Sequence, residues 1–171
     1  YQETGKNLVH SNFLHSLLLD HSGNVWVGSE FAGVTLLSVL SEGSYRIYPE
    51  HESINDYVNA IRTVVKMPDG GFWFGTRQGN VYAYDKNLEA ASCYKMPYNY
   101  IYAASCDGDG KLWLGTRTMG LCIDGRWYHK MAGDTLSLAH ENIFDIYRDD
   151  KNMMWIGTFG GGLNLAVSRK D

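Results

Sequence analysis

The sequence has little of what marks a disulfide-bonded or a disordered protein. Only three of its 171 residues are cysteines (Cys93, Cys106 and Cys122), and only three are prolines. An odd number of cysteines without CxxC spacing argues against a disulfide framework and against a zinc site. Few prolines beside nineteen glycines favour a chain with many tight turns over a disordered or proline-rich linker.

Long apolar runs and an excess of positive charge are also missing. The longest apolar stretches, at 17–19 and 34–40, are far too short to span a bilayer. The first residues, YQETGK, lack the basic and then apolar pattern of a signal peptide, and the sequence does not begin with Met. We therefore expect a mature, processed or excised segment. A formal charge of −4 disfavours nucleic acid as a partner.

A motif built around tryptophan occurs four times. Each copy has a Trp, an apolar residue, a Gly, and then Ser or Thr. An Asp stands six residues before the Trp in three copies, Met67 takes that place in the second, and an apolar residue stands twelve before each Trp. The anchors are Trp26, Trp73, Trp113 and Trp155, then Gly28, Gly75, Gly115 and Gly157, then Asp20, Asp107 and Asp149, then Leu14, Ile61, Ile101 and Ile143. Repeats of this kind decide the fold.

Each repeat predicts short strands joined by turns. In the first copy the spans 13–19, 24–29, 34–39 and 45–48 are the expected strands A to D. Asp suits the start of the A–B turn because its carboxylate accepts backbone N–H groups, and Gly23 suits a position of positive φ. We expect the Trp to fill the space between neighbouring sheets, the Gly after it to allow a close approach, and the following Ser or Thr to hydrogen-bond locally.

A four-stranded antiparallel unit that recurs about every 42 residues is typical of a β-propeller blade. The predicted fold is therefore an all-β propeller segment of about four blades, at approximately 12–48, 58–95, 99–131 and 141–168. Residues 1–6 are expected to end a preceding blade, and no room is left for a fourth strand D. We expect an arc of a larger ring, for example one of seven blades. The alternative is a four-bladed ring closed by residues 1–6.

The pattern Asp-x-x-Gly-x-x-Trp-(Ile/Val/Leu)-Gly-Thr-x-x-x-Gly-Leu, clearest at 107–121 and 149–163, resembles the two-component regulator propeller repeat. Departures are Met67, the shortened loop after Trp73, and Asn152 at a Gly position. The resemblance implies a periplasmic sensor region of a hybrid two-component histidine kinase of Bacteroidetes. It further implies a ligand derived from a polysaccharide, with the remaining blades, neighbouring domains of a longer chain and a homodimer as further partners.

No catalytic or metal-binding motif accompanies the repeats. The sequence has no HExxH, no Gly-x-Ser-x-Gly and no complete calcium loop, so we expect no metal and no cofactor, and no enzymatic activity of this segment. The three cysteines are expected to lie in strands as small apolar residues. A group of aromatic residues is expected to pack between blades: Tyr94, Tyr98, Tyr100, Tyr102, Trp127 and Tyr128.

Recognition by loops is the remaining function. The D–A and B–C loops are expected on one face of the propeller, where Arg beside exposed aromatic residues suits an acidic or sugar-like ligand. The candidate ligand-binding residues are Glu30, Phe31, Arg77, Arg117 and Phe159. Two alternatives to a sensor stay open: a free-standing lectin-like or scaffold propeller closed by oligomerisation, and an enzyme with carboxylates at the central channel. The dissimilar B–C loops favour one composite site, or none, over four equivalent ones.

Overall fold

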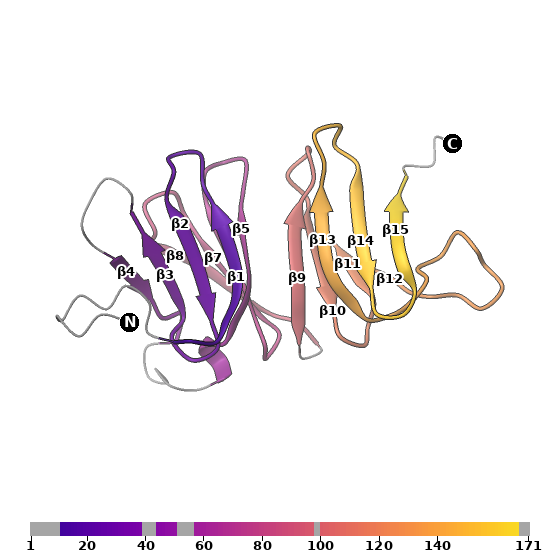
Figure 1. Cartoon of the computed structure of the whole chain (residues 1–171), viewed down its shortest axis with the longest axis horizontal. Coiled ribbons are helices and arrows are strands. Elements are labelled where there is room, and N and C mark those ends of the chain that lie inside the picture. Colours follow the sequence, from indigo (N-terminus) through magenta and orange to yellow (C-terminus); the bar gives the residue numbers. More distant parts are fainter. Residues whose placement is uncertain (1–10, 39–43, 51–56, 98–99, 168–171) are drawn as a thin grey trace. The chain divides into compact units, whose positions relative to one another are not determined.

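The computed structural model describes residues 11–38, 44–50, 57–97 and 100–167, and these residues form antiparallel sheets (Figure 1). A 3-10 turn, η2 (Tyr57–Asn59), accompanies the strands. Within this part of the chain no helix has the length and apolar character needed to cross a membrane. The chain divides into two compact units, unit 1 at Tyr1–Pro97 and unit 2 at Tyr98–Asp171.

Unit 1 contains two four-stranded sheets, each formed by strands consecutive in sequence. The first is β1 (Leu14–Leu19), β2 (Val25–Ser29), β3 (Val34–Leu37) and β4 (Ser44–Ile47). The second is β5 (Ile61–Lys66), β6 (Phe72–Thr76), β7 (Asn80–Tyr84) and β8 (Ala90–Lys95).

Unit 2 repeats this organisation with one strand fewer. Its first sheet is β9 (Ile101–Cys106), β10 (Leu112–Thr116), β11 (Leu121–Ile123) and β12 (Arg126–Tyr128). Its second is β13 (Ile143–Arg148), β14 (Met154–Thr158) and β15 (Gly162–Ala166). The all-β prediction, with one antiparallel sheet per repeat, is confirmed. The expectation for residues 1–6 lies outside the described residues.

The turns between the first two strands of each sheet have the backbone that the sequence predicts. Gly23, Gly70, Gly110 and Asn152 all have positive φ, between 63° and 90°. In the second copy, where Met67 replaces Asp, the same two backbone hydrogen bonds close the turn, and Asp69 caps it by accepting the N–H of Gly71. The loss of the leading Asp therefore changes the side-chain contacts of one turn and leaves its path intact.

The Gly of the motif permits close packing between neighbouring sheets in each unit. A Cβ on Gly28 would stand 2.9 Å from Cγ2 of Ile61, and one on Gly115 would stand 2.8 Å from Cβ of Ile143. Both isoleucines are fully buried, and both begin the first strand of the following sheet. The predicted close approach is confirmed for these two copies, whereas a Cβ on Gly157 would meet nothing nearer than 3.7 Å.

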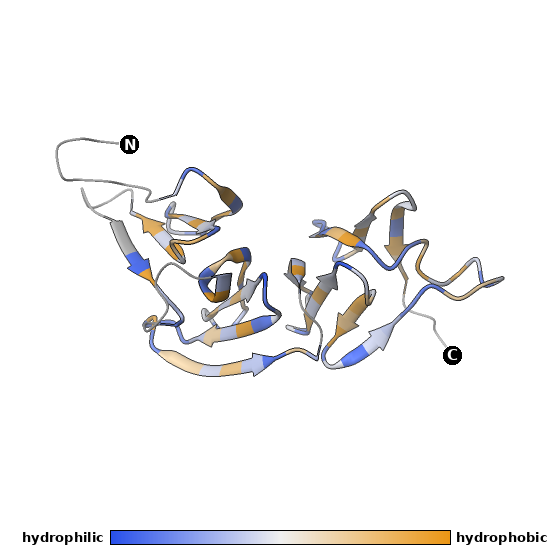
Figure 2. Cartoon of the chain, turned by 90° about the horizontal axis from the view of Figure 1, so that it is seen from below, coloured by the Kyte–Doolittle hydropathy of each residue, from blue (hydrophilic) through white to orange (hydrophobic). Residues whose placement is uncertain are grey.

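The tryptophans differ in their surroundings. Trp26 lies in the core of unit 1, where its ring centroid is 4.1 Å from that of Phe72, on the neighbouring sheet. Trp113 lies in the core of unit 2 with Ile143 and Ile156 of the neighbouring sheet. Trp73 instead stacks on Tyr94 of its own sheet at 5.5 Å. Figure 2 shows apolar residues recurring along the strands of each unit, as sheets buried between neighbours require.

Candidate functional site

One end of every sheet carries the same backbone irregularity. The first strand of each sheet has a bulge, and one residue per strand is left without a partner in the register. We call these the bulge residues: His15, Arg62, Tyr102 and Phe144. A β-bulge redirects a side chain at the end of a ladder.

A second position is fixed beside each bulge. The residue four after the motif Trp, here called the tip residue, follows the end of the second strand. Its N–H donates to the carbonyl of the residue that precedes the first strand, at 2.9–3.1 Å in all four copies. The tip residues are Glu30, Arg77, Arg117 and Phe159. The same backbone thus presents a pair of side chains in each repeat, while the side chains themselves change.

In unit 1 these positions form an ionic cluster around Glu30. The side chain of Glu30 is 10% exposed. Its carboxylate contacts Nε2 of His15, lies 3.2 Å from Nη2 of Arg62 and accepts from Nη1 of Arg77 at 2.6 Å. Arg62 Nη1 also lies 2.9 Å from Nδ1 of His15. Since an arginine can only donate, this contact makes Nδ1 the acceptor and places the imidazole proton on Nε2, toward Glu30.

These neighbours stabilise the ionised form of Glu30. Burial alone would raise the pKa of Glu30, but the hydrogen bond from His15, the charge of Arg62 and the hydrogen bond from Arg77 outweigh it and lower the pKa. The tip residue Arg77 also covers the ring of Tyr57 at 4.4 Å, and Phe31 contacts that ring at 5.2 Å. The structure therefore brings Glu30, Arg77 and Phe31 together, with Glu30 as the buried centre.

In unit 2 the equivalent positions form an aromatic surface instead. The bulge residues Tyr102 and Phe144 stack with their centroids 5.5 Å apart and their planes at 21°. The tip residue Phe159 lies 5.7 Å from Phe144 and 6.2 Å from the ring of His140. Phe144 is 51% exposed and Phe159 60% exposed, which is high for large apolar side chains that contact one another.

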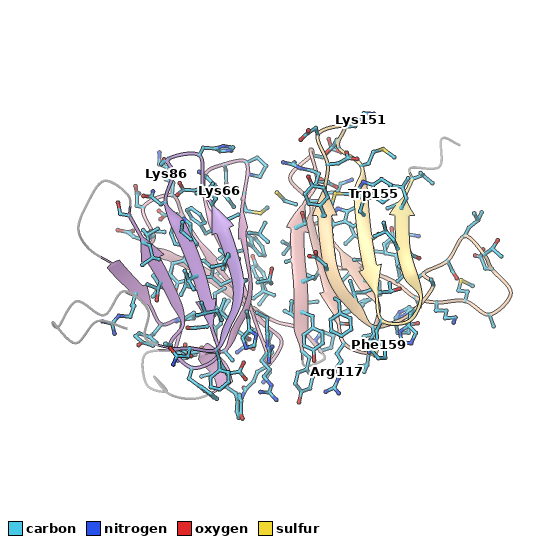
Figure 3. All side chains as sticks on the ribbon, in the orientation of Figure 1. Lys66, Lys86, Arg117, Lys151, Trp155 and Phe159 are labelled. Carbon is cyan, nitrogen blue, oxygen red and sulfur yellow. The ribbon has the colours of Figure 1, made fainter. Side chains whose placement is uncertain are left out.

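Arg117 lies at the same end of unit 2 as Phe159 (Figure 3). It is exposed, and its guanidinium lies 5.4 Å from the centroid of Tyr100. Tyr100 has a φ of 73°, a conformation that is strained for a bulky residue and is typical of constrained functional segments. Figure 3 also shows Lys151 at the opposite end of this unit. We refer to Tyr102, Arg117, Phe144 and Phe159 as the aromatic–arginine surface.

The sequence named the tip residues as candidates and did not name the bulge residues. His15, Arg62, Tyr102 and Phe144 each follow the apolar residue that stands twelve before the Trp. This spacing was the available signal, but a bulge depends on pairing between strands, which a strand pattern alone does not show. Of the aromatic residues expected to pack between blades, Tyr98 lies outside the described residues, and Tyr102 does contact the neighbouring sheet. Tyr94 stacks within its own sheet in unit 1, Trp127 stacks on His129, and Tyr102 contacts Phe144.

Metal-ligating and thiol side chains were the other candidates for chemistry. Among the described residues no group of three or more His, Cys, Asp or Glu side chains is placed to hold a metal ion. Cys106 and Cys122 are buried, and burial raises the pKa of both thiols, so they are protonated at neutral pH and poor nucleophiles. Cys93 is exposed on β8.

Comparison with known proteins bears out the resemblance. Residues 7–31, 95–118 and 137–160 match the two component regulator propeller family. The chain is 25% identical to histidine kinase P4 of Formosa agariphila over its whole length, which is 13% of that protein. Two structures of the extracellular domain of BT4673 from B. thetaiotaomicron are similar, with TM-scores of 0.80 and 0.76 at 21% and 19% identity.

One of these structures is described as a one component system and the other as a hybrid two component system. The similarity covers 99% and 98% of this chain, respectively. The chain spans only 23% of each of them. The likeness shows the fold, which is that of a segment of these β-propeller structures. The resemblance stated from the sequence is confirmed in that three segments of the chain match the two component regulator propeller family.

Proposed function

We propose that the chain is a ligand-sensing segment of the periplasmic region of a hybrid two-component sensor histidine kinase. The observation that carries the proposal is the match of three repeats to the two component regulator propeller, together with the likeness to a histidine kinase and to extracellular domains of sensor proteins. The chain contributes no catalytic step in this role. Phosphoryl transfer belongs to other domains of the longer protein.

The proposed input is a breakdown product of a complex polysaccharide. Aromatic rings suit the C–H faces of sugar rings, and their partial exposure in unit 2 supports contact with such a ligand. Ligand binding would favour one packing of neighbouring modules over another, and this difference in affinity would bias the kinase. The bulge and tip positions are the proposed contacts because their backbone is constant and their side chains vary.

The proposed partners include further blades of the same parent chain and a second copy. Leu14 is 46% exposed, whereas the equivalent Ile61 and Ile143 are fully buried against a preceding sheet. The apolar side chains of β15 are also exposed, with Leu163 at 65%. Both open faces match surfaces that are covered by a neighbouring sheet elsewhere in the chain, which supports continuation of the stack. A free-standing lectin-like or scaffold propeller closed by oligomerisation is the second candidate function.

Fractionation of the native organism tests the sensor proposal. An antibody against this segment should detect a membrane-bound protein several times larger than 19 kDa. Detection of a soluble product near that mass would overturn the sensor proposal and favour the free-standing propeller. Sedimentation of the short product would then establish whether several copies close a ring.

A further inference from the structure

We infer that the aromatic–arginine surface of unit 2 binds an acidic oligosaccharide, with a carboxylate or sulfate on Arg117 and a sugar ring against Phe144. This inference rests on the proposed glycan ligand and deepens it by naming the charge of the ligand and the residues that recognise it. Tyr102 stacks on Phe144, and Phe159 extends the surface.

The charge of the ligand follows from a comparison of two tip residues. Arg77 and Arg117 stand on the same backbone, each with its N–H bonded to the carbonyl before the first strand. The guanidinium of Arg77 donates a hydrogen bond to the carboxylate of Glu30 at 2.6 Å. That contact shows that an arginine at this position can hold a carboxylate.

No described carboxylate of unit 2 does the same for Arg117. Among the residues that the structure describes, no ion pair includes Arg117. Its side chain makes a cation–π contact with the ring of Tyr100. A guanidinium group that stacks on a ring uses the face of the guanidinium plane. Its N–H groups point outward within that plane and can donate to an oxyanion. An exposed arginine beside rings therefore complements a ligand that brings the negative charge itself.

The sugar ring follows from the exposure and orientation of the aromatic residues. Tyr102 and Phe144 are nearly parallel, and Phe144 keeps half of its surface exposed despite its contacts with Tyr102 and Phe159. Burying such rings in a fold normally stabilises it, so their exposure at one end of a sheet indicates a binding surface. The ring of a sugar presents apolar C–H groups on a face of similar size.

Calorimetric titration of the 171-residue chain tests the inference with four probes. Tetragalacturonate and its methyl ester have the same skeleton and differ in charge. A sulfated carrageenan disaccharide and its neutral, desulfated form test a sulfate in place of a carboxylate. We expect at least one acidic probe to bind, and its neutral counterpart to bind about tenfold more weakly or worse, because a charge-assisted hydrogen bond is lost.

Two variants and two matched controls locate the site. Arg117→Gln should weaken binding of the acidic probe about tenfold and should abolish the preference for it over the neutral form. Phe144→Ala should weaken binding of both forms. Arg126 covers Tyr128 at 5.5 Å on β12, much as Arg117 covers Tyr100, so Arg126→Gln and Tyr128→Ala should leave affinity unchanged. If Phe144→Ala lowers the thermal midpoint, Phe144→Leu replaces it.

The inference is overturned if neither acidic probe binds more tightly than its neutral form, or if Arg117→Gln behaves like Arg126→Gln. These results are independent of membrane fractionation. Binding of a neutral glycan that is insensitive to Arg117 would overturn the acidic ligand and leave the sensor proposal standing. A soluble native protein of about 19 kDa that binds the acidic probe through Arg117 would overturn the sensor proposal and leave the acidic ligand standing.

Discussion

The carboxylate of Asp107 accepts a hydrogen bond from the indole N–H of Trp113 at 3.0 Å, across the turn between β9 and β10. The other oxygen of the carboxylate accepts the backbone N–H groups of Asp109 and Lys111. Asp20 and Asp149 make the same bonds to Trp26 and Trp155, at 3.1 and 2.9 Å. The motif Asp therefore closes the turn and also fixes the Trp ring, which for Trp26 and Trp113 lies in the core of its unit.

Replacing this carboxylate should destabilise unit 2. Asp107→Ala removes three hydrogen bonds and leaves the half-buried indole N–H without its acceptor, so we expect a loss of about 2 kcal/mol in the free energy of unfolding. Urea denaturation followed by tryptophan fluorescence measures the change. Asp109→Ala, in the same turn, alters an exposed side chain and should change stability by less than about 0.5 kcal/mol. Equal effects of the two variants would contradict the role assigned to Asp107.

Stability should decrease in mild acid. Burial by itself raises the pKa of Asp107, but hydrogen bonds from Trp113 and from two backbone N–H groups outweigh it, so its pKa lies below the ordinary value. The pKa of Asp20 is lowered in the same way. A carboxyl with a lowered pKa in the folded state stabilises the fold above the ordinary aspartate pKa of about 3.9, and this contribution is lost as pH falls through the folded value.

We therefore expect the urea midpoint to fall between about pH 5 and pH 3. It should be little affected by these aspartates between about pH 6 and pH 8, where they are ionised in both states. Asp107→Asn should reduce the steepness of the acid loss, since one of the linked carboxyls is gone. An unchanged slope in this variant would show that the bonds to Asp107 do not lower its pKa.

An added methyl group should distinguish two copies of the motif Gly. Gly115→Ala would place a Cβ against the buried Ile143 and should cost about 1–3 kcal/mol through overpacking. Gly157→Ala is the matched control, because the space around its Cβ is open to 3.7 Å in this chain. We expect the control to change stability by less than about 0.5 kcal/mol. Thermal denaturation of both variants gives the comparison.

Removing the charge of Glu30 should lower the free energy of unfolding, because the positive charges of Arg62 and Arg77 then lack their counterion. Glu30→Gln leaves two arginines close together in a half-buried position, so we expect a loss of about 3 kcal/mol. A double-mutant cycle with Arg77→Gln should give a coupling of about 1–2 kcal/mol, with the double variant more stable than the sum of the single effects predicts. Strict additivity would mean that the contact at 2.6 Å contributes nothing to folding.

Strands, turns and the tip residues could be predicted because each depends on neighbours in sequence. The glycines of positive φ and the Asp that caps each turn follow from local backbone chemistry. The bonds from Ser29 and Thr116 to the carbonyls of Gly33 and Gly120 were also expected. In the second copy the shortened loop changes the partner, and Asn80 donates its N–H to Thr76 instead.

The four repeats, their strands and turns, and the resemblance to the two-component regulator propeller follow from the sequence, because they depend on spacings that recur about every 42 residues. Which side chains meet depends on the folded structure. A bulge places Arg62 beside Glu30, 32 positions away, and Phe144 on Tyr102. Such contacts depend on the register of strands and on the packing of one sheet against the next, and one residue of slippage would move each side chain to another face.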